Sequence, residues 1–396
     1  MKYSVIDISS SGVSMIAADI RAGLSEIVFK DRTSLTLLHY LEGTDLTRRG
    51  IEKLTEALCV MKDKCASLGV DRIYLISTGA LRAVGNMDEV REAIFSACAL
   101  PVNVIDGVAE AYCDYISNRV FSSYDSAVLI DIGGASIEVC DLSCDKEEGR
   151  RCLDFGLLTL HNKFVKGIQP SEAEAKAIKK FLVRRFDRAA LPREGAYKTV
   201  VMAGATTLAL YDVYAEFCKA APEEGVRAMQ YKKFKKLVKH LVGGAGRSRL
   251  LLDAAPERLH SVGLAALVAR ALVKRFDAQV ILVSDRGVKE GYLQLLLEGG
   301  IEGEWFSFSA TPPAEEPSVS AAAEPAQDAA PKKRGRSAKE SAQDAAPKKR
   351  GRPAKESAQG AAPKKRGRPA KESAQGAAPK KRGRPPKAKQ AEEKLS

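Results

Sequence analysis

Two segments of nearly the same pattern, VIDISSSG at residues 5–12 and LIDIGGASIE at residues 129–138, decide the fold of this chain. In each, an apolar strand ends in an aspartate, Asp7 or Asp131, and a tight turn of small residues leads into a second strand. Small residues let backbone N–H groups approach an anion closely, and serine hydroxyls add further donors. An aspartate at such a strand end can hold a hydrated Mg²⁺ beside the phosphate. One turn of this kind is commonly an ordinary hairpin, but two copies in equivalent places predict phosphate held from both sides of a cleft.

The phosphate contacts are expected to come from the small residues of the two turns, Ser10, Ser11, Gly133, Gly134 and Ser136. A third segment, VVMAGATTLAL at residues 200–210, places a Gly-Ala-Thr-Thr turn between a predicted strand and a predicted helix. Backbone amides at a helix start favour an anion, so Gly204 and Thr206 join the predicted phosphate contacts. The alternative for this third segment is tight strand–helix packing, with Thr206 as the helix cap.

The order of elements around the first two turns is repeated along the chain. Short strands are predicted at 2–8, 13–19 and 25–29, and again at 126–132, 136–141 and 151–155. Helices and strands then alternate in both halves, which is typical of the α/β class. The helices predicted in the second half include a basic amphipathic one at 229–242 and a long one at 256–275. We therefore predict two similar domains, 1–123 and 124–300, with a ligand cleft between them.

The charge of the chain is concentrated at its C-terminal end. The 396 residues carry 63 Lys and Arg against 50 Asp and Glu, a net charge of +13. From Lys332 onward there are 22 basic and 6 acidic side chains, a net of +16, which leaves −3 for residues 1–331. A 16-residue unit begins at Pro331 and recurs at Pro347, at Pro363 and, in diverged form, at Pro379.

These repeats hold no large apolar side chain, so they cannot bury enough surface to offset chain entropy. We therefore predict a disordered tail over 331–396, preceded by an acidic Ala/Pro-rich linker over 301–330.

Several classes of protein are excluded by the sequence. No apolar run approaches the roughly 18 residues that a membrane span needs. Asp7 and Asp19 interrupt the apolar stretches at the N-terminus, so we expect no secretory signal there. The eight cysteines form no paired CxxC framework, and most lie in apolar segments, as expected for thiols in a reducing compartment. A cytoplasmic protein is expected.

Six segments follow one another in a specific order: VIDISSS, YLISTGALRAVGN, VIDGVAEAYCDYI, LIDIGGASIEV, VMAGATTLAL and VSDRGVKEGYL. This ordered set, spread over residues 1–297, resembles the exopolyphosphatase / guanosine pentaphosphate phosphohydrolase family of the actin and sugar kinase superfamily. The resemblance implies two ribonuclease-H-like (actin-like ATPase) domains around a cleft. It also implies Mg²⁺-dependent removal of terminal phosphate from polyphosphate or guanosine pentaphosphate. Asp285 in the last segment is expected to cap the final helix.

The resemblance further implies roles for single residues. Glu110 matches the acidic residue that activates the attacking water, and Glu138 matches a second catalytic carboxylate. Asp7, Asp131 and Glu138 match the positions that would hold the metal, and Arg82 matches an arginine placed on the phosphate chain. Hydrolysis of a phosphoanhydride needs an in-line water, neutralisation of charge and positioning, with little covalent work, so these residue types suit it.

The phosphate turns depart from the family's usual pattern. Ser9 stands where the first turn usually has glycine, Ser11 replaces an asparagine, and Ala135 replaces the third glycine of the second turn. The ionisable residues are retained while the phosphate contacts vary. Two hypotheses follow: a hydrolase of altered substrate or reduced rate, and a catalytically weak polyphosphate or nucleotide sensor that acts as a DNA-binding protein. A kinase-like member of the superfamily is disfavoured, because no pocket for a nucleotide base can be identified in the sequence.

Each tail repeat centres on Arg-Gly-Arg, followed by proline in three copies and by Ser337 in the first. The Lys-Lys-Arg-Gly-Arg-Pro pattern resembles the AT-hook. Glycine lets the backbone enter the narrow minor groove of A·T tracts, where the negative potential attracts the flanking arginines. The DNA-binding residues would then be Arg334, Arg336, Arg350, Arg352, Arg366, Arg368, Arg382 and Arg384. A solvated basic tail, or binding to polyphosphate or RNA, is the alternative.

The expected partners follow from these two parts of the chain. They are polyphosphate or guanosine pentaphosphate as substrate, and A·T-rich DNA through the tail, which would associate the protein with the nucleoid. A homodimer is expected only by analogy with other proteins of this fold.

Overall fold

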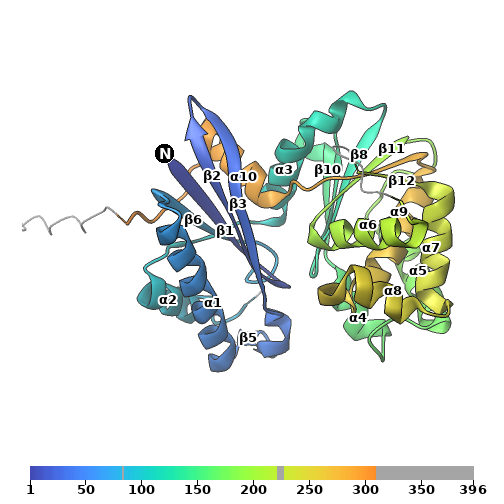
Figure 1. Cartoon of the computed structure of the whole chain (residues 1–396), viewed down its shortest axis with the longest axis horizontal. Coiled ribbons are helices and arrows are strands. Elements are labelled where there is room, and N and C mark those ends of the chain that lie inside the picture. The colour runs from blue at the N-terminus through green and yellow to red at the C-terminus, as the bar shows by residue number, and fades with distance from the viewer. Residues whose placement is uncertain (83, 221–226, 309–396) are drawn as a thin grey trace, which may run out of the picture. The chain divides into compact units, whose positions relative to one another are not determined.

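The computed structural model describes residues 1–82, 84–220 and 227–308. The chain divides into a first unit, Met1–Ser318, and a second, Val319–Ser396. The predicted tail and the predicted linker from residue 309 onward lie outside the described residues. The described part of the first unit consists of two large β-sheets, each covered by helices (Figure 1).

The first sheet is built from the N-terminal part of the chain, in the order β3-β2-β1-β6-β7. The first three strands form an antiparallel meander, and β6 and β7 continue the sheet parallel to β1. Both faces of β1 are covered, which explains its almost continuous apolar sequence. The strands are β1 Lys2–Ser9, β2 Gly12–Arg21, β3 Leu24–Ser34, β6 Arg72–Ser77 and β7 Val102–Val104, with a separate small pair, β4 Leu41–Glu42 and β5 Asp45–Leu46.

The second sheet repeats this arrangement, in the order β10-β9-β8-β11-β13-β12. Again the first three strands, β8, β9 and β10, form an antiparallel meander. Strands β11 and β13 lie parallel to β8, and β12 adds an antiparallel strand at the edge. The strands are β8 Ala127–Ile132, β9 Ile137–Asp141, β10 Arg150–Leu153, β11 Thr199–Ala203, β12 Arg227–Gln230 and β13 Val280–Val283. The α/β fold class and the duplicated architecture predicted from the sequence are confirmed.

The helices cover the sheets through apolar faces at helical spacing. In α1, for example, Leu54, Leu58 and Met61 are fully buried, and the Thr47 side chain caps the start by accepting from the Gly50 N–H. The helices are α1 Arg48–Ser67, α2 Met87–Cys98, α3 Gly107–Asn118, α4 Leu157–Phe164, α5 Glu172–Arg188, α6 Ala205–Cys218, α7 Tyr231–Gly243, α8 Arg247–Ala254, α9 Val262–Phe276 and α10 Val288–Glu298. Short 3-10 turns occupy Leu37–Tyr40, Arg119–Ser123, Glu147–Gly149 and Pro256–Arg258.

Helices α3 and α10 lie between the two sheets and each packs on the sheet of the other half. Helix α3 packs on β8, β9 and β10, whereas α10, which lies within the predicted second domain, packs on β1 and β2 (Figure 1). The two helices also pack on each other so closely that a Cβ on Gly291 would overlap the carbonyl of Cys113. The Asn118 amide donates to the Arg286 carbonyl (3.4 Å), so the two chain connections between the halves touch each other.

Residues 301–308 belong to the first half of the fold, although the sequence predicts a linker from residue 301. Phe306 and Ile73 exchange two backbone hydrogen bonds of 2.9 Å. The edge at Ile73 is open because β7 pairs only with residues 75–77 of β6. Arg72 lies over the ring of Trp305, with 4.2 Å between guanidinium carbon and ring centroid.

Several local predictions in the second half were wrong. The helix expected over 256–275 begins only at Val262, because the chain turns after the 3-10 turn Pro256–Arg258. The helix expected from residue 229 begins at Tyr231, since residues 227–230 form β12. Asp285 does not cap α10. The N-cap of this helix is Gly287, whose N–H donates a hydrogen bond to the Glu290 carboxylate. Helices α4 and α8 were not predicted.

No helix in the described ranges is both long enough and apolar enough to cross a membrane. All eight cysteines are free thiols.

Candidate active site

The predicted phosphate turns and the third small-residue segment line one cleft of about 510 Å³. Most of the predicted site residues lie on its wall: Asp7, Ser10, Ser11, Glu110, Asp131, Gly133, Gly134, Ser136, Gly204 and Thr206. The other two residues predicted for this site, Arg82 and Glu138, are not among those that line the cleft. The sequence therefore brings together, from five separate segments, the residues that its motifs single out.

The first two turns touch across the cleft. A Cβ on Gly134 would overlap the Ser10 hydroxyl, so the second turn comes close to the first at a residue that has no side chain. The start of α4 holds the second turn from behind, because the N–H groups of Leu157 and Leu158 donate to the carbonyls of Gly133 and Gly134 (both 2.9 Å). The carbonyls of this turn are thus paired within the protein.

A row of three residues crosses the first sheet at the cleft. Asp7 on β1 stands opposite Ser14 on β2, which stands opposite Arg32 on β3. Arg32 donates to the Ser11 hydroxyl (3.0 Å) and carbonyl (3.2 Å), so it also supports the first turn. Burial raises the pKa of Asp7 above its ordinary value, while the positive charges of Lys289 and Arg32 act in the opposite direction.

The second sheet has a row in the equivalent place, with different chemistry. Asp131 on β8 stands opposite Glu138 on β9, which stands opposite Cys152 on β10. The Cys152 thiol donates to the Glu138 carboxylate (3.3 Å). Burial, and then the charge of Glu138, raises the pKa of Asp131 to about 7. Burial likewise raises the pKa of Glu138, which is 1% exposed.

Glu110 forms an ion pair with Arg82 at the start of α3. The Asp106 carboxylate caps this helix by accepting from the N–H groups of Val108 and Ala109 (2.9 and 2.8 Å), and Glu110 follows in its first turn. Arg82, predicted to contact phosphate, thus contacts the predicted base instead of lining the cleft.

Several cations and one carboxyl at this site were not predicted from the sequence. Lys30, Arg32, Arg258, Arg286 and Lys289 line the cleft, and Arg258 donates to the Thr206 hydroxyl (3.3 Å). The strand predicted at 25–29 extends to Ser34 as β3, and this extension carries Lys30 and Arg32. Asp114 on α3 is fully buried near Asp131, and neither carboxylate oxygen has a hydrogen-bond partner among the described residues. Burial raises the pKa of Asp114 well above its ordinary value.

The third segment forms the turn that the sequence predicts, but with a different cap. Gly204, at φ +92° and ψ 153°, is the N-cap of α6, and Thr206 lies inside the first turn of the helix. A Cβ on Gly204 would overlap Oδ1 of Asp131, so this glycine lets the third segment approach the end of β8. The alternative in which Thr206 caps the helix is therefore wrong, while its predicted phosphate contact stays a prediction.

The residues of the cleft suit a hard divalent cation. Oδ1 of Asp7 is buried without a hydrogen-bond partner, and the pKa values of Asp7 and Asp131 are raised, so both carboxylates would gain from a nearby cation. The described residues contain no group of three or more His, Cys, Asp or Glu side chains able to hold a metal ion by themselves. Mg²⁺ commonly takes one or two carboxylates together with waters and substrate phosphates, and Asp7 and Asp131 match that donor set.

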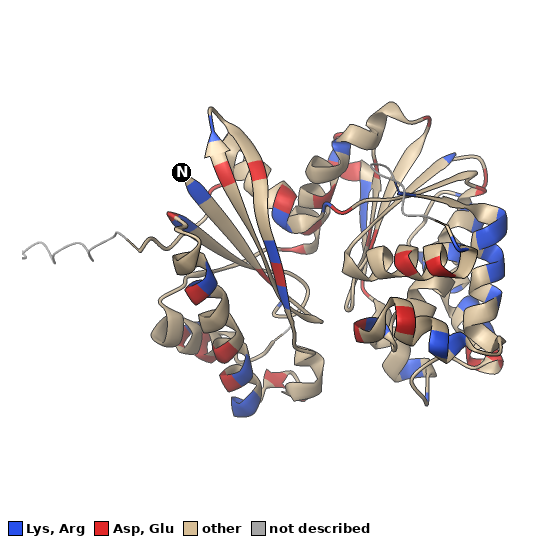
Figure 2. Ribbon diagram, viewed as in Figure 1, with Lys and Arg blue, Asp and Glu red and all other residues tan. Residues whose placement is uncertain are grey.

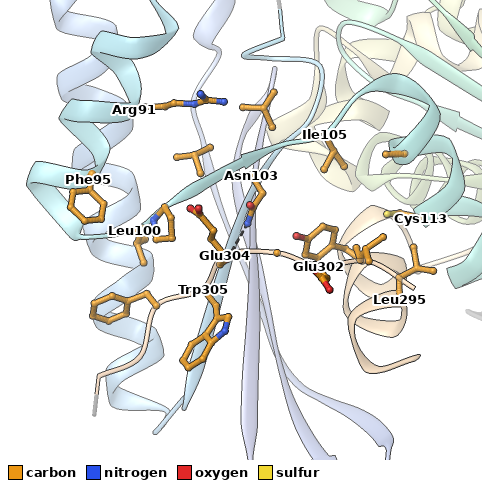
Figure 3. Close-up of a pocket in the computed structure, with 18 of the residues that line it drawn as sticks. Arg91, Phe95, Leu100, Asn103, Ile105, Cys113, Leu295, Glu302, Glu304 and Trp305 are labelled. Atoms are coloured by element: carbon orange, nitrogen blue, oxygen red, sulfur yellow. Dashed lines mark hydrogen bonds between the residues drawn. The ribbon is translucent and has the colours of Figure 1, made fainter. Parts of the chain in front are cut away.

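A larger hollow, of about 1450 Å³, lies beside β7 and is chemically different. Figure 3 shows Phe95, Leu100 and Trp305 in its lining, with the Asn103 amide donating to the Glu304 carbonyl (3.0 Å). None of the predicted site residues lines it. The residues predicted to bind phosphate therefore lie at the smaller cleft and not at this hollow.

The two sheets of matching topology and the cleft lined by their strand ends define an actin-like fold. The chain belongs to the Ppx/GppA phosphatase family, whose family model matches residues 16–298. An exopolyphosphatase structure from Cytophaga hutchinsonii matches with a TM-score of 0.66 at 18% identity, covering 76% of this chain and 98% of that one. The Aquifex aeolicus member of the Ppx/GppA family matches with a TM-score of 0.62 at 22% identity, covering 76% of this chain and 99% of that one.

Curated relatives match at a similar level. The guanosine-5'-triphosphate,3'-diphosphate pyrophosphatase of Aeromonas hydrophila is 24% identical over 307 residues, which is 74% of this chain. The chain spans 59% of the length of that relative.

The AT hook motif model matches three segments of the tail, 347–359, 363–375 and 379–391. These contain six of the predicted DNA-binding arginines: Arg350, Arg352, Arg366, Arg368, Arg382 and Arg384. Arg334 and Arg336 of the first repeat lie ahead of these matches and stay a prediction.

Proposed function

We propose that this protein is a Mg²⁺-dependent phosphoanhydride hydrolase that releases terminal phosphate from inorganic polyphosphate or guanosine pentaphosphate. Its tail would tether it to A·T-rich DNA and keep it with the nucleoid in the cytoplasm. The observation that carries the catalytic part is the single cleft that Asp7, Glu110 and Asp131 all line, together with three turns of small residues.

The cleft offers a polyanion both donors and neutralising charge. The hydroxyls of Ser10, Ser11 and Ser136 supply hydrogen-bond donors on two sides. Arg32 and Lys289 supply positive charge next to Asp7, which lowers the cost of placing phosphate oxygens beside a carboxylate. Positioning and electrostatic stabilisation of this kind provide most of the catalysis in phosphoryl transfer.

Glu110 is the residue proposed to receive a proton from the attacking water. Arg82 holds its carboxylate at the first turn of α3, on the cleft wall. Asp7 and Asp131 would hold Mg²⁺, which when bound neutralises charge on the phosphate oxygens. Glu138, paired across the hairpin with Asp131 and hydrogen-bonded by Cys152, would set the position and charge of Asp131 from behind.

Phosphate release by the purified full-length chain tests this proposal. Polyphosphate, guanosine pentaphosphate and ATP are each supplied with Mg²⁺, and free phosphate and substrate binding are both measured. Release from one of the first two that is lost in Glu110→Gln, with binding retained, is the expected result. Glu56→Gln, an exposed position on α1, serves as the control with the same chemical change.

A catalytically weak sensor of polyphosphate or nucleotide is the second candidate. The ion pair between Arg82 and Glu110 favours it, because a carboxylate engaged by a guanidinium is less available to a water. Binding of polyphosphate or guanosine pentaphosphate without phosphate release from any substrate would support the sensor. Neither binding nor release would reject both candidates.

The DNA tether is tested separately on duplexes of the same length. A preference for A·T-rich over G·C-rich duplex is expected, and it should be lost when the central arginine pairs of the three matched hooks are changed to alanine. Equal affinity of the unchanged chain for both duplexes would reject the AT-hook assignment.

A further inference from the structure

One helix on the surface of the second half carries a purely cationic face. Helix α7 has five exposed side chains that are all lysine, and it contains no acidic residue: Lys232, Lys233, Lys235, Lys236 and Lys239. None of their ammonium groups lies within 4.0 Å of a carboxylate in the part of the chain that the structure describes. Figure 2 shows blue bands, which mark Lys and Arg, along the helix labelled α7 in Figure 1.

The lysines do not improve the stability of the helix. Like charges three and four positions apart, such as Lys232 and Lys236 or Lys236 and Lys239, repel each other. The first turn holds Lys232 and Lys233 and no acidic residue, which is unfavourable against the helix dipole. The fold needs only the opposite face, where Phe234, Leu237, Val238 and Leu241 are buried.

Neighbouring α5 extends the positive surface. Helices α5 and α7 both pack on α9, and a Cβ on Gly243 at the end of α7 would lie 2.6 Å from the Glu172 carboxylate at the start of α5. Exposed cations without a carboxylate partner among the described residues continue along α5, namely Lys176, Lys179, Lys180, Arg184 and Arg188. The remainder of this part of the chain does not share the excess, because residues 1–308 carry 41 basic and 40 acidic side chains in all, a net charge of +1.

We propose that the lysine face of α7 binds the phosphate backbone of double-stranded DNA, as a second, sequence-independent contact beside the tail. This inference rests on the proposed DNA tether. A body that has almost no net charge but one strongly positive face is attracted to DNA through that face, so the tethered body will turn it toward the duplex. Once the tail is bound, the tether holds this face at a high effective concentration near the DNA, so weak phosphate contacts are sufficient.

Other polyanionic surfaces suit this face less well. None of the α7 lysines lines the phosphate cleft, so they do not contact the reacting end of the substrate. All the large apolar side chains of α7 between Phe234 and Leu241 are buried, so the helix has no exposed apolar residues to insert into a membrane surface. Lysine is suited to phosphate contacts that position a protein without reading sequence.

The test compares the full-length chain with two triple variants of equal charge change. Lys232→Gln/Lys236→Gln/Lys239→Gln removes three charges from α7, and glutamine keeps good helix propensity. Arg48→Gln/Arg49→Gln/Lys53→Gln removes three exposed charges from α1, where they are mixed with Glu52 and Glu56. Affinity for A·T-rich and G·C-rich duplexes is measured between 50 and 200 mM salt.

Each phosphate contact contributes about 0.9 to the slope of log affinity against log salt, so losing three should reduce the slope by about 2.7. Over this fourfold salt range the affinity of the α7 variant should therefore fall about 40-fold less than that of the unchanged chain. The reduction should be the same on both duplexes, and phosphate release should not change. Lys→Arg at the same three positions should keep the slope, which checks that charge and not folding is responsible.

Three results would overturn the proposal. These are an unchanged slope in the α7 variant, an equal loss in the α1 variant, or a higher KM for long-chain polyphosphate without any change in DNA binding. If the unchanged chain shows no A·T preference, the tether fails as an AT-hook, but the α7 contribution is still measured on the G·C-rich duplex.

Discussion

Gly204 offers the sharpest test of how the cleft is built. Its φ of +92° with ψ of 153° is a backbone conformation that is essentially restricted to glycine, and a Cβ there would overlap Oδ1 of Asp131. Gly204→Ala therefore imposes two costs. The backbone costs about 1–3 kcal/mol, and the overlap with a packed carboxylate adds about 1–3 kcal/mol.

The chain supplies a control that has a positive φ but no overlap. Gly195 has a φ of +82°, and nothing lies within 4 Å of a Cβ built on it. Gly195→Ala should thus carry a backbone cost without an overlap, and both variants share the gain of about 0.4–1 kcal/mol from a less flexible unfolded chain. The difference between the two variants, about 1–3 kcal/mol, reports the contact with Asp131 together with the difference between the two backbone costs.

Denaturant unfolding of both variants gives this difference directly, and phosphate release gives its effect on the site. We expect Gly204→Ala to be the less stable variant and to lose most of its phosphate release, while Gly195→Ala keeps the activity of the unchanged chain. Equal stability of the two variants together with full activity in Gly204→Ala would refute the placement of the third segment against Asp131.

Three further predictions concern the carboxylates. Glu110→Gln should lower phosphate release by about 10²–10⁴-fold, the range for loss of a general base, with unchanged binding in a titration. Because the pKa of Asp131 is raised to about 7, the folded metal-free protein binds more protons than the unfolded chain between about pH 4 and pH 7. Its free energy of unfolding should therefore fall as pH rises through this window. Asp131→Asn should flatten the slope of the free energy of unfolding against pH, and an equal slope in the variant would contradict the assignment of this effect to Asp131. Mg²⁺ at ten times its Kd should raise the free energy of unfolding at pH 8 by about 1.4 kcal/mol, and this gain should disappear in Asp7→Asn.

The motifs predicted the walls of the cleft because their chemistry is local. An apolar strand, an aspartate and a turn of small residues follow one another in the chain, so Asp7 and Asp131 were found from sequence. Because the order of elements is duplicated in the two halves, both aspartates were predicted to lie at one cleft. The residues opposite Asp7 in the sheet could not be predicted in this way. Arg32 shares a row with Asp7 because β3 pairs in register with β2, and the register between strands depends on tertiary structure.

The other contacts and elements that were not predicted also depend on residues far apart in the chain or on too short a segment. Lys289 acts on Asp7 from a helix far along the chain, and the pairing of Arg82 with Glu110 joins segments on two elements. The short helix α4, which holds the second turn, has too few residues for a clear periodic pattern. Residues 301–308 were assigned to a linker from composition, although backbone pairing at Ile73 decides their place.

The contact between Asn118 and Arg286 also limits how the two halves can move. The chain passes between the sheets only twice within the described residues, once after α3 and once before α10, and these passages meet at this hydrogen bond. Two tethers that meet at one point form a pivot, so they allow the halves to rotate about that point and oppose sliding or separation. Spectroscopic labels placed on the two sheets should therefore report distance changes that grow steadily with their separation from Asn118.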